Sequence, residues 1–378
     1  TKIVWSYPVS MEGKRFELFE QIWHEAYQKY FGENLKNLTA VSESITPYIY
    51  YKDEESAVAN MVSIDIGGGT TDMVIVEKEQ VKFITSFRFA ANAIFGNGYA
   101  KNNINGIIRL FKPEIEQVIE ETGLRRLEEI HSDISKEKDS ANIASFFFSL
   151  KNNQDIINAD KKENTKIADR LDFHSKLNAN SSHKIIFTLF YAAIIYHLAN
   201  LMKSQKLSLP RHIAFSGNGS KSIQILSNKT DVLEEFTKLI FEKVFGESYQ
   251  GKKLTIIQNS DKTKEVTCKG AILYNSEVYN FNNIQKVILQ GTDNQSVFTK
   301  EKYADIDQEE LLKNSVEEVK RFLQLLLVLL NDYPEFMKKF GINYDSLELF
   351  EKECFSDDLI TFATKGLNQK LHEVNIKQ

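Results

Sequence analysis

The sequence predicts an α/β protein with a mixed sheet and flanking helices, together with a helical insertion and a helical C-terminal extension. Strand-like and helix-like segments alternate over residues 1–60, and three short strand-like segments with tight turns follow between residues 61 and 95. The alternation returns at residues 206–278 after a long, polar, helix-rich stretch. These observations favour one α/β framework interrupted by an insertion.

Composition agrees with this class. The chain has 378 residues, of which 42% are hydrophobic and 26% charged, enough for two or more domains with a sizeable core. The net charge of -5 leaves no broad basic surface, so we expect no nucleic-acid partner. Cys268 and Cys354 form neither a disulfide framework nor a metal-binding spacing, which fits a reducing cytoplasm.

The first elements can be justified in order. A β-rich run at residues 2–7 ends at Pro8, and apolar residues at helical spacing follow in residues 11–33. A second strand is expected at 38–44 and a short helix directly after it. The next three strands are short enough, and their turns tight enough, to predict an antiparallel meander.

The middle and the end of the chain are expected to be mainly helical. Residues 185–202 approach the length of a membrane span, but they include His197 and Asn200, and we expect a buried helix and no membrane contact. Further strands are expected near 211–216, 252–260 and 286–292. In the extension an apolar stripe predicts packing against the body, with a partner-binding helix as the alternative: Leu311, Val316, Val319, Phe322 and Leu326.

Three consecutive glycines join the first two strands of the meander. They do not form a P-loop, because no Gly-Lys-Ser/Thr ending is present and a strand follows instead of a helix. We expect positive φ angles here and backbone amides that form an anion-binding concavity, with hydroxyl donors beside it. The alternative is a purely structural hairpin. The candidate phosphate-binding residues are Gly67, Gly68, Gly69, Thr70 and Thr71.

Two carboxylates accompany this turn. Asp65 precedes the glycines, where it would hold Mg²⁺ through water, since a carboxylate beside phosphates requires a cation between them. Glu43 ends an expected strand, where it would orient a water for attack on a phosphate. The alternative for the Glu43 segment is a helix cap formed by Ser42, Ser44 and Thr46.

A second glycine turn joins a strand to a helix at residues 217–219. Ligands in α/β sheets lie at such positions, and a helix start favours phosphate or a polar sugar. An ordinary strand-to-helix turn is the alternative. Asn218 between the two glycines can adopt the left-handed conformation, so it is compatible with a turn at this position.

Taken in this order, the motifs resemble the actin, sugar-kinase and heat-shock-chaperone ATPase superfamily, with its ribonuclease-H-like fold. The likeness is greatest to the ATPase domain of the seventy-kilodalton heat-shock chaperones. The run "IDIGGGTTDMVIV" is similar to that family's second phosphate motif, and "IAFSGNGSKSIQIL" resembles its adenosine motif. The resemblance covers residues 1–95 and 206–278.

The resemblance implies a division of the chain. Residues 1–60 would be the C-terminal part of a first actin-like lobe, and 61–95 with 206–278 a second lobe that carries the phosphate and adenosine motifs. Residues 96–205 would be a helical insertion lobe and 279–378 a helical extension.

The resemblance also implies roles and ligands. ATP or ADP with Mg²⁺ would bind, with Asp65 on the magnesium side and Glu43 positioning or activating the attacking water. The glycine turn at residues 67–70 would hold the β- and γ-phosphates. The residues near the adenosine would be Gly217, Asn218, Gly219, Ser220 and Lys221.

The superfamily's first phosphate segment has no counterpart in residues 1–378, so we expect a missing N-terminal half of the same protein to act as a partner. Micromolar ATP binding requires about 8 kcal/mol, and hydrogen bonds to charged groups contribute about 1.5–3 kcal/mol each. Weak binding by this chain alone is therefore expected. Two main hypotheses remain, a chaperone-like or switch ATPase whose extension binds a protein client, and a non-catalytic scaffold or filament-forming module. A sugar kinase is a third option, but nothing in the sequence marks a sugar pocket.

Overall fold

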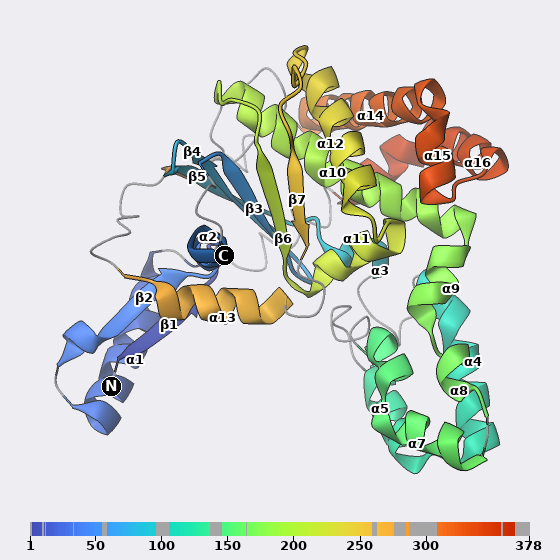
Figure 1. The fold of residues 1–378 in the computed structure, drawn as a ribbon, viewed down its shortest axis with the longest axis horizontal. Coiled ribbons are helices and arrows are strands. Elements are labelled where there is room, and N and C mark those ends of the chain that lie inside the picture. The colour runs from blue at the N-terminus through green and yellow to red at the C-terminus, as the bar shows by residue number, and fades with distance from the viewer. Residues whose placement is uncertain are drawn as a thin grey trace. The chain divides into compact units, whose positions relative to one another are not determined.

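A computed structural model describes most of the chain, and it divides into two compact units (Figure 1). Unit 1 comprises residues 1–179, 210–231 and 252–287, and unit 2 comprises the remainder. Each unit is described by itself. The described residues are 2–9, 11, 13–32, 34–54, 59–95, 106–136, 146–163, 165–258, 263–275, 285–286, 308–356 and 358–366.

Unit 1 begins with a small parallel sheet. Strand β1 (Ile3–Tyr7) pairs in parallel with β2 (Leu38–Ser42), and the two are joined through α1 (Lys14–Phe31) and the short η1 (Leu35–Asn37). Helix α2 (Thr46–Glu54) follows β2. The expected alternation of strands and helices is confirmed here.

A six-stranded sheet forms the centre of unit 1, in the order β7-β6-β3-β4-β5-β8. Neighbouring strands β3, β4 and β5 are antiparallel, whereas β6 and β7 run parallel to β3. The sheet is therefore mixed, and the predicted α/β class with a meander is confirmed. The strands are β3 (Met61–Ile66), β4 (Thr71–Glu77), β5 (Gln80–Phe87), β6 (His212–Ser216), β7 (Thr255–Gln258) and β8 (Gln285–Lys286).

Apolar residues of this sheet pack against α2 and α13 (Thr263–Leu273) in one core cluster. Met61, Ile49 and Ala214 are completely buried, and burial of each large apolar side chain contributes about 1.5–3 kcal/mol. The packing fixes α2 over the strands whose ends carry the glycine turns. It thereby sets the position of the β2–α2 turn that contains Glu43.

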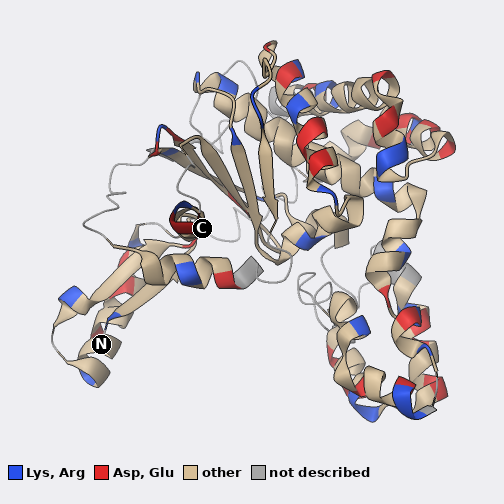
Figure 2. Cartoon of the chain, in the orientation of Figure 1, with Lys and Arg blue, Asp and Glu red and all other residues tan. Residues whose placement is uncertain are grey.

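The insertion of unit 1 is helical, as predicted, and acidic and basic side chains are interspersed over it (Figure 2). Arg170 bonds the carboxylates of Glu114 and Glu121, and Lys176 also bonds Glu114, so its helices are cross-linked by ion pairs. Helix α3 (Ala91–Phe95) precedes the insertion. The elements of the insertion in unit 1 are α4 (Gly106–Thr122), α5 (Arg125–Lys136), η2 (Leu150–Asn152), α7 (Gln154–Glu163), α8 (Ile167–Arg170) and α9 (Phe173–Ala179).

Unit 2 is a helical assembly drawn from three separate stretches of chain. Tyr196 packs on Phe322 with ring centroids 5.2 Å apart, and Phe236 packs on Phe336 at the same spacing, 5.2 Å. Aromatic contacts therefore join its early helices to the extension. The helices are α10 (Ser181–Ser204), most of α12 (Thr230–Phe245), α14 (Gln308–Asp332), α15 (Pro334–Phe340) and α16 (Tyr344–Cys354).

Helix α10 is the one described helix whose length and composition would allow it to cross a membrane, and 67% of its most apolar stretch is buried inside the protein. Tyr191, in the middle of α10, is fully buried, and its hydroxyl lies 2.5 Å from that of Thr237 in α12. High burial is the property predicted for this segment from its sequence.

Two expectations for the extension need correction or lie outside the described residues. Val316, Phe322 and Leu326 are buried as the stripe predicts, but Val319 is 42% exposed and does not belong to the packed face. The side chain of Leu311 is outside the described residues. Of the strand expected at 286–292, the structure describes only its first residue, within β8.

Candidate functional site

The triple-glycine turn closes the hairpin between β3 and β4. The N–H of Gly67 donates to the carbonyl of Thr70 at 2.9 Å, and a Cβ atom on Gly67 would lie 3.2 Å from that oxygen. None of the three glycines has a positive φ, so this expectation was wrong. The N–H groups of Gly68 and Gly69 donate no hydrogen bond within the described part of the chain. They are therefore available to an anion.

Of the two hydroxyl residues after the glycines, Thr71 does not match its expected role as a phosphate donor, whereas the role of Thr70 stays a prediction. Thr71 is fully buried, and its hydroxyl donates to the carbonyl of Phe89 at 2.6 Å. Because that hydrogen is already used inside the protein, Thr71 supports the turn instead of pointing to a ligand. Thr70 is half-buried and its carbonyl closes the turn.

The second glycine turn packs directly on the first. A Cβ atom on Gly217 would lie 2.4 Å from the carbonyl oxygen of Ile66, and one on Gly219 would lie 2.5 Å from that of Gly67. Only glycine permits this approach, because real Cβ atoms do not come so close to a backbone oxygen. The positive φ of this turn, 80°, is at Gly217. Asn218 does not adopt the left-handed conformation, and Gly217 supplies the positive φ of this turn instead.

The residues after Gly219 stabilise the turn from within. The hydroxyl of Ser220 donates to the carbonyl of Gly217 at 2.7 Å, and that of Ser222 donates to the carbonyl of Gly219 at 2.6 Å. These bonds hold η3 (Asn218–Ser220) at the start of α11 (Lys221–Leu226). Lys221 itself is exposed and forms no hydrogen bond or ion pair with any described residue.

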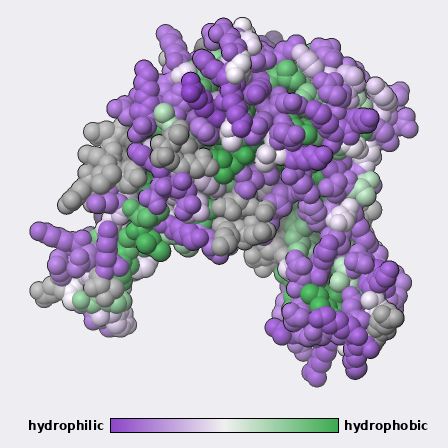
Figure 3. Space-filling model, viewed as in Figure 1, coloured by the Kyte–Doolittle hydropathy of each residue, from purple (hydrophilic) through white to green (hydrophobic). Residues whose placement is uncertain are grey.

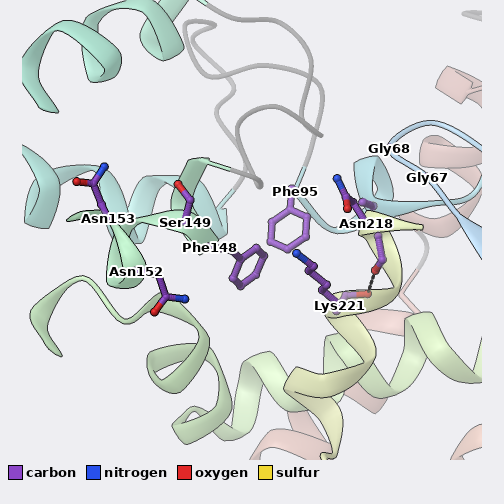
Figure 4. A pocket seen from close by; sticks show the side chains of 12 residues that line it. Gly67, Gly68, Phe95, Phe148, Ser149, Asn152, Asn153, Asn218 and Lys221 are labelled. Atoms are coloured by element: carbon purple, nitrogen blue, oxygen red, sulfur yellow. Dashed lines mark hydrogen bonds between the residues drawn. The ribbon is translucent and has the colours of Figure 1, made fainter. Parts of the chain in front are cut away.

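Both glycine turns line one cavity of about 510 Å³, called here the first cavity (Figure 4). This volume lies within the range of ordinary small-molecule sites. Its opposite wall comes from the insertion, with aromatic, hydroxyl and amide side chains. The lining residues used below are Gly67, Gly68, Phe95, Phe148, Ser149, Asn152, Asn153, Asn218, Gly219, Lys221 and Ser222.

Three carboxyl groups gather at the end of the central strands, beside this cavity's glycine turns. Asp65 and Asp72 are direct partners across β3 and β4, and direct partners in an antiparallel pair present their side chains on one face. Ser216, the partner of Asp65 on β6, donates to Asp65 Oδ2 at 2.9 Å. Like charges placed directly opposite each other destabilise a sheet unless something compensates them.

Asp72 is the residue that the sequence reasoning left without a role. Its side chain is more than nine-tenths buried, Ser44 donates to its Oδ2 at 3.2 Å, and its Oδ1 has no hydrogen-bond partner in the described structure. Burial raises the pKa of Asp72, while the hydroxyls of Ser86 and Ser44 lower it. Counting residues outward from the turn would have revealed that Asp72 faces Asp65.

Glu43 lies in the turn between β2 and α2, where its N–H donates to the carbonyl of Tyr7 at 2.9 Å. Burial, and then the negative charges of Asp72 and Asp65, raise the pKa of Glu43 to about 6. Glu43 is not part of the first cavity's wall, but it is electrostatically coupled to both aspartates. Thr46, the first residue of α2, donates its hydroxyl to the carbonyl of Glu43 at 2.8 Å, a bond that supports the turn but does not cap an N–H group of the helix.

These residues fit Mg²⁺ bound together with phosphate and water. Within the described ranges no group of three or more His, Cys, Asp or Glu side chains is arranged to hold a metal ion by itself. Mg²⁺ commonly keeps several waters and takes one or two carboxylates plus substrate phosphates. The orphaned Oδ1 of Asp72 and the neighbouring carboxylate of Asp65 match that demand.

Comparisons with known proteins give a weak structural likeness. No family model and no curated protein matches the sequence. Similar solved structures include the ethanolamine utilization protein EutJ from Carboxydothermus hydrogenoformans, at 12% identity and TM-score 0.28, covering 72% of this chain and 66% of that one.

Two further structures are similar to a comparable degree. The ROK hexokinase from Thermus thermophilus matches at 11% identity and TM-score 0.30, covering 72% of this chain and 78% of that one. MreB 5 of Spiroplasma citri, solved with AMPPNP, matches at 13% identity and TM-score 0.29, covering 73% and 68%. None of these three is a heat-shock chaperone, and likeness at this level carries no argument about the site.

Proposed function

We propose that this chain is the nucleotide-binding part of an actin-like ATPase that binds ATP with Mg²⁺ in the first cavity. The observation that carries the proposal is the meeting of two glycine turns, from the neighbouring strands β3 and β6, on one cavity of about 510 Å³ beside Asp65. Nucleotide sites in α/β proteins lie at such strand ends.

The phosphates would lie against the first turn. The free N–H groups of Gly68 and Gly69 would donate to phosphate oxygens, and each hydrogen bond to a charged group contributes about 1.5–3 kcal/mol. The opposite wall, with Phe148 and Asn152, would face the base, near the adenosine residues expected from Gly217 to Lys221. Lys221 would place a positive charge at the end of the first cavity that holds the adenosine.

Mg²⁺, when bound, would neutralise phosphate charge and so reduce the repulsion between Asp65 and Asp72. Glu43 would accept a proton from the attacking water, since a pKa of about 6 lies close to neutral pH, where a general base is effective. Hydrolysis would then weaken the binding of the nucleotide, so that the protein acts as a switch. A chaperone-like use of that switch is part of the same proposal.

A further segment of polypeptide would complete the sheet of β1 and β2. Parallel sheets are normally buried on both faces, and two strands alone are marginally stable. Large apolar side chains are exposed nearby on α1 and α13, with Leu18 at 60%, Ile22 at 51% and Ile272 at 76% exposure. Apolar surface is visible beside β1, β2 and α13 (Figure 3). The missing N-terminal half of the same protein is the proposed partner.

Isothermal titration of ATP into the protein, with and without Mg²⁺, tests the proposal. We expect binding in the high micromolar range with Mg²⁺, and we expect Asp72→Asn to weaken it about tenfold while leaving Mg²⁺-free binding unchanged. Asp53→Asn, an exposed aspartate of α2, serves as the matched control.

Absence of heat at millimolar ATP, in a protein that melts cooperatively and has been supplied with the N-terminal half, would contradict nucleotide binding. The scaffold alternative would then be favoured. Light scattering that rises with protein concentration would identify filament formation.

A further inference from the structure

A second cavity of about 430 Å³ adjoins the first one. The two share Phe148, Asn152 and Lys221 in their walls, so these three side chains separate the volumes. The second cavity is otherwise bounded by the insertion and by one side of α11 with the residues that follow it. Its own residues used below are Phe147, Lys151, Leu171, Asp172, Phe173, His174, Gln224 and Asn228.

The floor of the second cavity is rigid and apolar. Phe147 and Phe173 are almost completely buried and meet edge to face with ring centroids 5.3 Å apart, and Leu171 is fully buried. Phe111 packs on Phe173 from the other side, with centroids 4.3 Å apart. These buried side chains therefore keep the floor in shape when a ligand enters. The half-buried Phe148, which also lines the cavity, is the part of this floor whose ring can meet the C–H face of a flat or cyclic molecule.

The acidic group in the wall is already neutralised. Lys151 Nζ lies 2.5 Å from Asp172 Oδ2, and Ser175 donates to the same carboxylate through its backbone N–H and its hydroxyl. Burial acts to raise the pKa of Asp172, but these hydrogen bonds outweigh it and leave the pKa lowered. Asp172 is thus a fixed anion paired with a fixed cation.

Four further polar side chains of the wall can contact a ligand. The ammonium group of Lys221 and the amides of Asn152, Gln224 and Asn228 form no hydrogen bond with any residue that the structure describes. One unpaired cation beside three free amides gives the cavity a net attraction for an anion and several donors and acceptors for hydroxyl groups.

We infer that the second cavity binds a small sugar phosphate, with the phosphate on Lys221, the hydroxyls on Gln224 and its neighbouring amides, and the sugar's C–H face on the phenylalanine floor. This ligand is distinct from the nucleotide of the first cavity. The inference depends on Lys221, which lines both cavities, and on Gln224 and Asn228, which line only the second, and it stands whether or not ATP binds next to it.

Calorimetric titration with ribose 5-phosphate tests the inference, with ribose and inorganic phosphate as comparison ligands. We expect ribose 5-phosphate to bind more tightly than either comparison ligand, because only it engages both Lys221 and the amides. Lys221→Met should weaken its binding about tenfold, the loss expected for one charge-assisted hydrogen bond. Gln224→Ala should weaken it by about threefold to fivefold.

The controls separate this inference from the proposed function. Lys229→Met removes an equivalent positive charge close to the cavity but outside its wall, and it should leave ribose 5-phosphate binding unchanged. Gln224→Ala should leave ATP binding unchanged, because Gln224 lines only the second cavity. Ribose 5-phosphate binding without ATP binding would support this inference and contradict the nucleotide proposal.

Three titration results would each overturn the inference. It fails if ribose 5-phosphate gives no binding, or if Lys221→Met and Gln224→Ala both bind it like the unaltered protein. Equal affinity for inorganic phosphate and ribose 5-phosphate would also overturn it, since the amides and floor would then contribute nothing. Thermal melting of each variant confirms that the fold is retained.

Discussion

The carbonyl oxygen of Thr46 in α2 lies so close to Gly270 of α13 that a Cβ atom on Gly270 would be 1.8 Å from it. The contact joins two helices from distant parts of the sequence through their backbones. It fixes the helix that follows Glu43 against the helix that follows β7.

We expect Gly270→Ala to lower the free energy of unfolding by at least about 3 kcal/mol, because the added methyl group meets backbone and cannot be accommodated by a side-chain rotation. Chemical denaturation measures the change. Gly366→Ala, where a Cβ atom meets nothing within 4 Å, should change stability by no more than about 0.5 kcal/mol. Equal stability of the two variants would show that α2 and α13 do not approach as described.

Glu43 should make the ligand-free protein less stable as the pH rises. Its pKa in the folded state, about 6, is above the usual value of 4.5, so the folded state binds the proton more tightly than the unfolded state. The resulting stabilisation is present below pH 4.5 and is lost as the pH rises through 6.

Urea denaturation between pH 4.5 and 7.5 checks this dependence. Glu43→Gln should lose less stability than the unaltered protein as the pH rises. Glu54→Gln, at an exposed position, should lose as much stability as the unaltered protein. A pH profile of Glu43→Gln identical to that of the unaltered protein would show that the Glu43 carboxyl is not perturbed.

Asp65→Asn should leave the fold intact and weaken the Mg²⁺-dependent part of ATP binding by about tenfold. The amide retains an oxygen that accepts the Ser216 hydroxyl, so we expect the melting temperature without ligand to change by only a few degrees. Titration with ATP at several Mg²⁺ concentrations gives the affinity. A large drop in melting temperature without ligand would assign Asp65 a structural role.

The hydroxyls of Tyr191 and Thr237 should stabilise unit 2 as a pair. A double-mutant cycle with Tyr191→Phe and Thr237→Val should give a coupling energy of about 1 kcal/mol, because the contact is buried and the double variant removes both polar groups. Denaturation of the four proteins supplies the cycle. Additive effects would show that the two hydroxyls do not interact.

Strand patterns were sufficient to predict a mixed sheet with a meander, whereas only the resemblance implied that the two glycine turns serve one nucleotide. Both turns follow strands that run in the same direction, and Ser216 is the parallel neighbour of Asp65, so their ends had to lie together. The role of Thr71 was missed because a hydroxyl next to glycines predicts a donor but not its partner, which is the carbonyl of Phe89.

The opposite wall of the first cavity was beyond sequence reasoning. Phe148 and Asn152 belong to a polar insertion without a recognisable motif, and they reach the glycine turns only through the packing of that insertion on α11. The sequence likewise separates α10 from α14 by more than 100 residues, and only side-chain packing, such as Tyr196 on Phe322, brings them together.

Because unit 2 is assembled from three separate stretches of chain, a gene product that stops after α13 would still contain α10 and most of α12 without the helices that cover them. Phe236, which packs on Phe336 and Phe340, would then face water. Shortened versions of this protein would aggregate unless they kept the complete extension, so deletion studies of the nucleotide site should use point substitutions instead.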